Sequence, residues 1–231
     1  MSDIFTREIR VGSELVDYEK KVKLSSFMNW FQQCSVRHTE ELGMGRHMTF
    51  DKGFLWVIIS EHILINRMPE YDEEIVIEST PGMTLHYFFP RNIVIKNKNG
   101  EILVKANALW ALIDKNTRQF IDPSENGIII NGINRDTDVV PVIKLKVPEL
   151  HKKKTFTATY SMVDINGHLG NTHYMDLMND IMFENDGKLE IKETTILFKK
   201  EIPLKNRFVI KYEKIDGKYY FQSKYFEARF N

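Results

Sequence analysis

The same order of predicted elements occurs twice in this chain, and this internal repeat limits the folds that it can adopt. The clearest similarity is the break after a long apolar strand, which reads ILINRMPEYDEEIVI at 63–77 and ILFKKEIPLKNRFVI at 196–210. In each copy a strand and an apolar helix precede this break, and further strands follow it. A repeat of this kind indicates two copies of one structural unit, each with its own helix.

Each copy contains one helix with a buried face. In the first copy, apolar residues recur at helical spacing over 24–42, Ser25 or Ser26 can cap the start, and Gly43 can end the helix. In the second copy the same spacing predicts a helix over 171–184. Strands are predicted at 4–22, 54–65, 73–79, 85–97 and 101–114, and again at 155–160, 191–202, 207–215 and 218–230.

An antiparallel sheet wrapped around one apolar helix is the hotdog architecture, and two such units in one chain make a double hotdog. We therefore predict an α+β fold in which two helices lie back to back under a continuous sheet. The N-terminal hotdog is expected at 1–125 and the C-terminal hotdog at 151–231. Residues 126–150 are irregular and rich in Pro, Asn, Gly and Asp, which predicts a linker.

Composition restricts the partners and the environment of the protein. Lys+Arg and Asp+Glu number 32 each, so the net charge is zero and does not favour nucleic acid. The single cysteine, Cys34, excludes an intrachain disulfide, and its place on the helical core face favours a buried structural thiol. The N-terminus lacks an apolar signal region, and no apolar run approaches the ~18 residues of a membrane span. These features predict a cytoplasmic protein.

The richest candidate site lies in YSMVDINGHLGNTHYMDLM, residues 160–178. Asp164, Asn166 and His168 alternate there, and alternate residues of an extended segment point the same way. The helix then begins near Asn171 or Thr172, either of which is a natural N-cap. Free N–H groups at a helix start suit a polarised carbonyl or an oxyanion.

The spacing alone leaves other interpretations of this stretch open. Asp, Asn and Gly are common turn residues, so a plain loop is an equal alternative. A metal site is disfavoured, because His168 and His173 do not have the i, i+4 spacing of a helical zinc motif. We expect neither a metal nor a cofactor.

Several separated stretches, in this order, resemble the acyl-ACP thioesterases in their bacterial, single-chain form. They are WVIISEHILINRMPEYDEEIVIES, KANALWALIDKNTRQFIDPS, VDINGHLGNTHYMDLMND and ILFKKEIPL, and the resemblance covers nearly the whole chain. Plant members carry an Asp-x-Asn-x-His motif, which Asp164, Asn166 and His168 match. Their later Arg-Arg-Glu-Cys falls at 199–202, so Glu201 takes the Glu position and Ile202 replaces the Cys.

The resemblance implies hydrolysis of fatty acyl-ACP to free fatty acid and ACP. We predict a water molecule activated by Glu201 with His168, because no cysteine nucleophile is available at that position. Glu201 is expected on a strand among apolar residues, where partial burial would suit it to act as a base. Asn166 would hold the water or the substrate, and Asp164 would orient the loop or His168.

Gly170, Asn171 and Tyr174 are the expected substrate-binding residues, with backbone N–H groups after Gly170 on the thioester oxygen. The first copy has VKLSSF at its helix start and no Asp-x-Asn-x-His, so we predict one active site per chain and an acyl pocket in the N-terminal unit. The acidic carrier protein would meet basic residues. The candidates are Lys152, Lys153, Lys154, Lys199, Lys200, Lys205 and Arg207.

Alternatives to this function remain. An acyl-CoA thioesterase would use the same lysines for phosphate groups, and a hotdog dehydratase would need a His and carboxylate set on the helix, where Asp176 and Asp180 lack a convincing partner. A non-catalytic acyl-binding module would not need the four polar residues of the candidate site. No nucleic acid or membrane partner is expected, and pairing into a homodimer is open.

Overall fold

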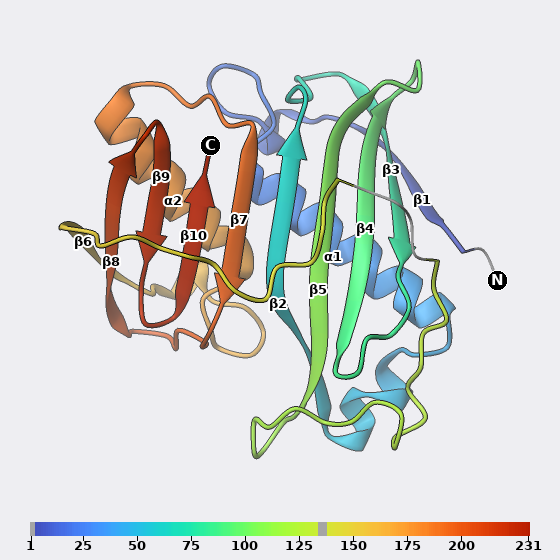
Figure 1. Ribbon diagram of the computed structural model, residues 1–231. Helices are drawn as coiled ribbons and strands as arrows, with labels where there is room; N and C mark the ends of the chain where they lie inside the picture. Colours follow the sequence, from blue (N-terminus) through green and yellow to red (C-terminus); the bar gives the residue numbers. More distant parts are fainter. Residues whose placement is uncertain (1–2, 134–137) are drawn as a thin grey trace.

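The computed structural model describes residues 3–133 and 138–231 as one ten-stranded antiparallel sheet with two long helices on one face (Figure 1). The helices are α1 (Leu24–Glu41) and α2 (Asn171–Asp186). The strands are β1 (Phe5–Arg10), β2 (Phe54–Ile65), β3 (Glu74–Pro81), β4 (Phe88–Asn97), β5 (Ile102–Asp114), β6 (Lys152–Thr157), β7 (Glu193–Phe198), β8 (Arg207–Ile215), β9 (Lys218–Gln222) and β10 (Phe226–Phe230). Short 3-10 turns occur at Ser13–Leu15 (η1), Arg46–Met48 (η2), Phe50–Lys52 (η3) and Tyr160–Met162 (η4).

The order of strands is the same in the two halves when each is followed outward from the centre. The sheet order is β1-β3-β4-β5-β2-β7-β10-β9-β8-β6, so β2 and β7 form the central pair, joined from Ser60↔Leu197 to Leu64↔Glu193. α1 and α2 contact each other behind this centre. The predicted α+β double hotdog is confirmed, while the domain boundaries stay a prediction.

The core lies between the helices and one face of the sheet, as the apolar patterns require. On α1, Phe27, Phe31 and Cys34 are completely buried, and on α2 Met178 and Ile181 are also buried. Strand β8 shows the two-residue period of a half-buried strand, with buried and exposed residues in alternation. One face of the sheet therefore packs on the helices, and the other is available for the linker and for solvent.

The described linker residues after 137 cross the face of the sheet opposite the helices (Figure 1). Val139 and Leu150 are buried, and Nζ of Lys105 on β5 lies 2.9 Å from Oδ1 of Asp138. Residues 134–137 of the predicted linker lie outside the described part of the chain. No helix of the described residues is long and apolar enough to cross a bilayer.

The predicted helix starts at 24 and 171 agree with the structure, whereas the predicted caps were wrong. Lys23 and Gly170 are the N-cap residues, and neither makes a side-chain capping hydrogen bond. The single predicted strand at 218–230 is two antiparallel strands, β9 and β10. The chain reverses at 223–225, where the Ser223 N–H donates to the Phe226 carbonyl (2.9 Å).

Candidate active site

The Asp164–His168 segment is a tight turn, so the prediction of an extended segment was wrong. One oxygen of the Asp164 carboxylate accepts the N–H groups of Asn166 (2.8 Å) and His168 (3.2 Å). The Asp164 N–H in turn donates to the His168 carbonyl at 2.8 Å. Gly167 completes the turn with φ 76°, a conformation that favours glycine. Asp164 thus fixes the shape of the loop, which is one of the two roles predicted for it.

The segment that carries Glu201 is hydrogen-bonded to this turn. The Leu169 N–H donates to the Ile202 carbonyl (2.8 Å), and the Leu204 N–H donates to the Gly167 carbonyl (3.0 Å). The prediction that Glu201 lies partly buried on a strand was wrong, because β7 ends at Phe198 and the Glu201 side chain is 42% exposed. The strand pairing ends there because the N–H groups of Lys199 and Lys200 both donate to the single carbonyl of Tyr225 (2.7 and 3.1 Å).

His168 and Arg118 flank the Glu201 carboxylate from two different parts of the chain. Nδ1 of His168 lies 3.4 Å from Oε1 of Glu201, and Nη2 of Arg118 lies 3.2 Å from Oε2. The His168 contact has an ion-pair distance without hydrogen-bond geometry, and its Nδ1 is buried with no hydrogen-bond partner in 3–133 or 138–231. Sequence reasoning missed Arg118, since nothing in its turn distinguishes it from other exposed turn residues.

The start of α2 offers free backbone donors beside the turn. Gly170 is the N-cap, and its own N–H is occupied by Met162. The first-turn N–H groups of Asn171 and Thr172 have no backbone acceptor among the described residues, as expected for the first positions of a helix. Two donors at the positive end of a helix can hold an oxygen that gains negative charge.

Tyr174 lies behind this helix start, in the core. Its ring is 2% exposed and packs edge-on against Phe198 and Phe226, with centroids 5.3 and 5.1 Å away. Burial, with the nearby Glu201 charge, raises the pKa of its hydroxyl. The structure thus places Tyr174 where it supports the helix start. The substrate-binding roles of Gly170, Asn171 and Tyr174 stay predictions.

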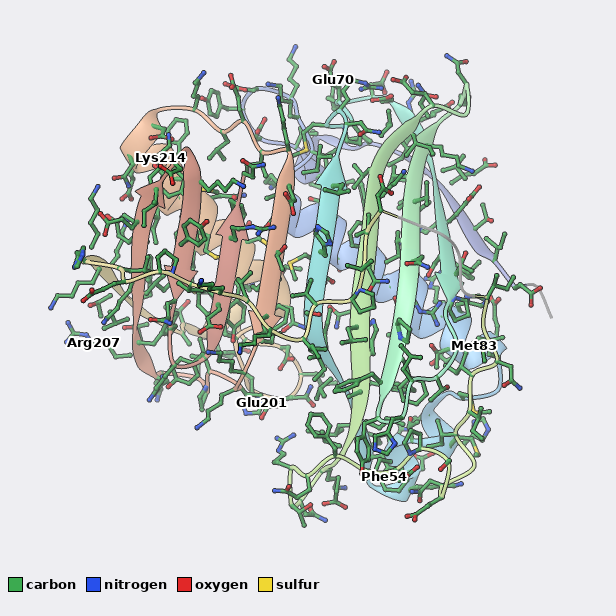
Figure 2. All side chains as sticks on the ribbon, in the orientation of Figure 1. Phe54, Glu70, Met83, Glu201, Arg207 and Lys214 are labelled. Carbon is green, nitrogen blue, oxygen red and sulfur yellow. The ribbon has the colours of Figure 1, made fainter. Side chains whose placement is uncertain are left out.

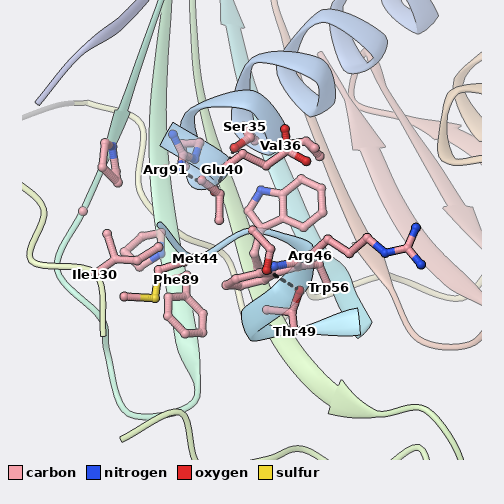
Figure 3. A pocket seen from close by; sticks show the side chains of 16 residues that line it. Ser35, Val36, Glu40, Met44, Arg46, Thr49, Trp56, Phe89, Arg91 and Ile130 are labelled. Carbon is pink, nitrogen blue, oxygen red and sulfur yellow. Dashed lines mark hydrogen bonds between the residues drawn. The ribbon is translucent and has the colours of Figure 1, made fainter. Parts of the chain in front are cut away.

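An apolar cavity of about 190 Å³ lies in the N-terminal half, between the C-terminal end of α1, β4 and β5 (Figure 3). Its apolar walls include Val36, Met44, Trp56, Phe89, Trp110 and Ile130. The guanidinium of Arg91 forms part of its polar wall. Arg91 is 4% exposed and hydrogen-bonded to Nδ1 of His38 (3.0 Å), and burial lowers its pKa to about 10.

The N-terminal half contains a second copy of the turn, with the same backbone hydrogen bonds. Asp17 accepts the N–H groups of Glu19 (2.9 Å) and Lys21 (3.0 Å), as Asp164 does for its own turn. Lys20 has φ 65° where the other turn has Gly167, and the Val22 N–H donates to the Pro69 carbonyl (2.9 Å). The two turns therefore have the same backbone conformation and the same pattern of hydrogen bonds.

The side chains of the two copies differ where chemistry would occur. Lys21 occupies the position that corresponds to His168, and Glu19 the position of Asn166. Met68, which directly precedes Pro69, occupies the position of Glu201. Of the two turns, only the C-terminal one thus combines an imidazole with a carboxylate, and one active site per chain stays a prediction. Within the described residues, no group of three or more His, Cys, Asp or Glu side chains is arranged to hold a metal ion.

Two protein-family models match this chain, one in each half. The model of the acyl-ACP thioesterase N-terminal domain matches residues 2–126, and the model of the C-terminal domain matches residues 145–227. The chain belongs to the acyl-ACP thioesterase family. The resemblance predicted from the separated motifs is thus confirmed.

Curated relatives of this acyl-ACP thioesterase family member come from plants. The chloroplastic acyl-[acyl-carrier-protein] hydrolase FATB3 of Cuphea viscosissima is 24% identical over 187 residues, which are 74% of this chain and 45% of the relative. The dodecanoyl-[acyl-carrier-protein] hydrolase of Umbellularia californica is 23% identical over 220 residues, or 86% of this chain and 56% of that protein. The chain thus spans about half the length of these curated relatives.

Solved structures share the fold over the entire chain. An acyl-ACP thioesterase from Bacteroides thetaiotaomicron superposes with a TM-score of 0.87 at 19% identity, covering 100% of this chain and 99% of that one. The 12:0-ACP thioesterase of Umbellularia californica has a TM-score of 0.83 at 18% identity, covering 100% and 97%. At these identities the similarity establishes the double hotdog, and the chemistry must be argued from the site.

Proposed function

We propose that this protein hydrolyses fatty acyl thioesters of acyl carrier protein to the free fatty acid and the carrier thiol. The observation that carries the proposal is the arrangement at the start of α2. There a carboxylate, an imidazole and two free backbone N–H groups come from segments that are hydrogen-bonded to one another. These are the groups that thioester hydrolysis by water requires, namely a base, a proton carrier and donors for the carbonyl oxygen.

In the proposed reaction the Glu201 carboxylate accepts a proton from a water molecule, whose oxygen attacks the thioester carbon. The N–H groups of Asn171 and Thr172 stabilise the oxyanion of the tetrahedral intermediate. The intermediate then collapses, the carbon–sulfur bond breaks, and the leaving thiolate receives the proton through His168. His168 is suited to this transfer because an imidazole can both accept and donate a proton. Asn166, on the exposed side of the turn, would contact the substrate.

The remaining parts of the proposal concern the two ends of the substrate. The cavity beside Trp56 and Phe89 is apolar and would hold the acyl chain. ACP is the proposed donor because the curated relatives are named as hydrolases of acyl-[acyl-carrier-protein]. An acyl-CoA donor is the competing possibility, and direct comparison of the two thioesters would distinguish them.

The test is release of free fatty acid from matched acyl-ACP and acyl-CoA substrates by the wild type, Glu201→Ala and His168→Ala. Lys21→Ala is the matched control, since Lys21 occupies the corresponding position of the other turn. We expect activity on acyl-ACP that falls at least about 100-fold in both active-site variants and stays within twofold in the control. Retained acyl binding without release from any thioester would contradict the proposal and favour a non-catalytic acyl-binding module. Release of fatty acid from acyl-CoA alone would identify CoA, and not ACP, as the donor.

A further inference from the structure

A hollow of about 500 Å³ lies on the C-terminal half of the sheet, at the edge where β8 begins and β9 ends. Arg207 marks its position at the lower left of the molecule (Figure 2). Its principal lining residues are Arg207, Val209, Lys211, Gln222, Ser223 and Lys224. Arg207, Val209 and Lys211 alternate with buried residues of β8, so they lie on the face of the sheet opposite the helices.

The charge of this hollow differs from that of the whole chain. Three of its lining residues are cations, Arg207, Lys211 and Lys224, and no Asp or Glu lines it. None of these cations has a carboxylate within ion-pair distance in the described part of the chain. Lys224 instead lies over the ring of Tyr225, 4.8 Å from its centroid. In a chain of zero net charge, this concentration of unpaired positive charge suits an anionic ligand.

Ser223 adds a polar group to the wall of the hollow. Its residue is only 8% exposed, and its Oγ is buried with no hydrogen-bond partner among residues 3–133 and 138–231. A buried hydroxyl without a partner is unfavourable, and such groups usually bind water or a ligand. A phosphate oxygen would accept a hydrogen bond from this hydroxyl and from the nearby cations at the same time.

The hollow is joined to the candidate active site through Tyr225, which also lines it. The carbonyl of Tyr225 accepts the N–H groups of Lys199 (2.7 Å) and Lys200 (3.1 Å), the residues directly before Glu201. The Tyr225 hydroxyl accepts a hydrogen bond from the side-chain amide of Asn206 at 2.6 Å, farther along the same segment. One wall of the hollow is therefore bonded to the segment that supplies the candidate base.

We propose that this hollow binds the phosphate group of the pantetheine arm that presents the thioester to Glu201. The proposal rests on the proposed function, because that function brings such an arm to the site. The ligand chemistry is a phosphate ester, which occurs both in carrier-bound phosphopantetheine and in CoA. Arg207 and Lys211 bind its oxygens from the strand, and Ser223 and Lys224 bind them from the turn.

The first experiment is calorimetric binding of 4′-phosphopantetheine and of pantetheine, which lacks the phosphate. The variants are Arg207→Ala/Lys211→Ala and Ser223→Ala. The control is Lys20→Ala, an exposed lysine in the turn bonded to Tyr71, near Glu70 at the opposite end of the sheet. We expect the double variant to weaken phosphopantetheine binding about tenfold, Ser223→Ala to weaken it about threefold, and neither to change pantetheine binding. Equal wild-type affinity for the two ligands, or equal loss in the control, would overturn the proposal.

The second experiment compares kcat/KM for acyl-ACP, acyl-CoA and acyl-pantetheine in the same variants. We expect kcat/KM to fall for a donor that carries the phosphate, through a higher KM with kcat unchanged, and to stay unchanged for acyl-pantetheine. A loss limited to acyl-ACP identifies the carrier as the source of the phosphate, and a loss limited to acyl-CoA identifies CoA. An equal loss on acyl-pantetheine would refute the phosphate site. Absence of hydrolysis from all three donors would refute the proposed function, while the calorimetric comparison would still decide the phosphate site.

Discussion

The guanidinium of Arg118 lies 3.2 Å from the carboxylate of Glu201, although the two residues come from opposite halves of the chain. Arg118 occupies a turn after β5 with φ 59°, and its N–H is bonded to the Asp114 carbonyl (2.9 Å). The N-terminal half therefore supplies a positive charge beside the candidate base of the C-terminal half.

Replacing Arg118 should reduce turnover modestly and leave the fold intact. Both side chains of the pair are about two-fifths exposed, 41% and 42%, so solvent screens their attraction. For Arg118→Ala we expect kcat to fall no more than about fivefold, the range of exposed ion pairs, with KM unchanged. Arg118→Lys should recover part of the loss. A fall as large as that of Glu201→Ala would show instead that Arg118 contacts the reacting atoms.

Asp164 provides a test that separates loop structure from proton transfer. Its Oδ1 accepts two backbone N–H groups, and the Oδ1 of an asparagine could accept the same two. Asp164→Asn should therefore keep most of the activity, whereas Asp164→Ala should lose about 1 kcal/mol of stability per hydrogen bond and much of the activity. Steady-state kinetics and thermal unfolding of both variants would decide, and equal inactivation by Asn and Ala would point to a chemical role of the carboxylate.

Glu61 should make the stability of the protein depend on pH. It is 1% exposed on β2, where it is paired with buried Ala108 and Ile196, and its Oε2 has no hydrogen-bond partner in the described residues. Burial raises its pKa from the ordinary 4.5 to about 8. Between these values the folded protein keeps a proton that the unfolded chain releases, so rising pH favours unfolding.

The neutral variant Glu61→Gln should remove this dependence. From about pH 4.5 to about pH 8 the wild type should lose up to about 1.4 kcal/mol per pH unit relative to the variant, and the difference should be constant above that window. Below pH 4.5 the favourable contribution of the protonated group is fully present. Urea unfolding at closely spaced pH values measures the difference, and parallel curves for the two proteins would rule out a buried neutral carboxyl.

Cys34 should resist alkylation in the folded protein. Its thiol is completely buried on α1, and burial raises its pKa, which lowers the fraction of reactive thiolate. We expect its reaction with iodoacetamide to be slow in buffer and fast in denaturant, with a rate that follows unfolding. Mass spectrometry of the single cysteine gives the measurement. Rapid labelling in native conditions would contradict the burial of this helix face.

The helices and the sheet could be predicted because their apolar periods are long and regular, as on α1 around Phe27 and Phe31. The end of β7 could not be predicted from the sequence. The apolar pattern continues to Ile202, which is indeed buried, but the strand stops because two N–H groups share the Tyr225 carbonyl. That contact comes from a turn far along the chain, whose sequence contains neither Gly nor Pro.

The candidate site was predictable in its residues and less so in its geometry. The motif identified His168 and Glu201, and the structure brings them within 3.4 Å. The position of Glu201 depends on hydrogen bonds to the neighbouring turn, which no local pattern reports. The contact between Arg118 and Glu201 depends on how the two halves pack together, so it is visible only in the folded chain.

The central pairing of β2 with β7 has a further consequence, because both strands belong to one polypeptide. In a symmetric homodimer, any replacement would alter both turns together, and dilution could separate the subunits. In this chain the corresponding positions of the two turns hold different residues, Lys21 and His168. Because the two units are joined in one chain, a substitution can change one turn without changing the other, and the candidate base of one half remains tethered to the cavity of the other at any protein concentration.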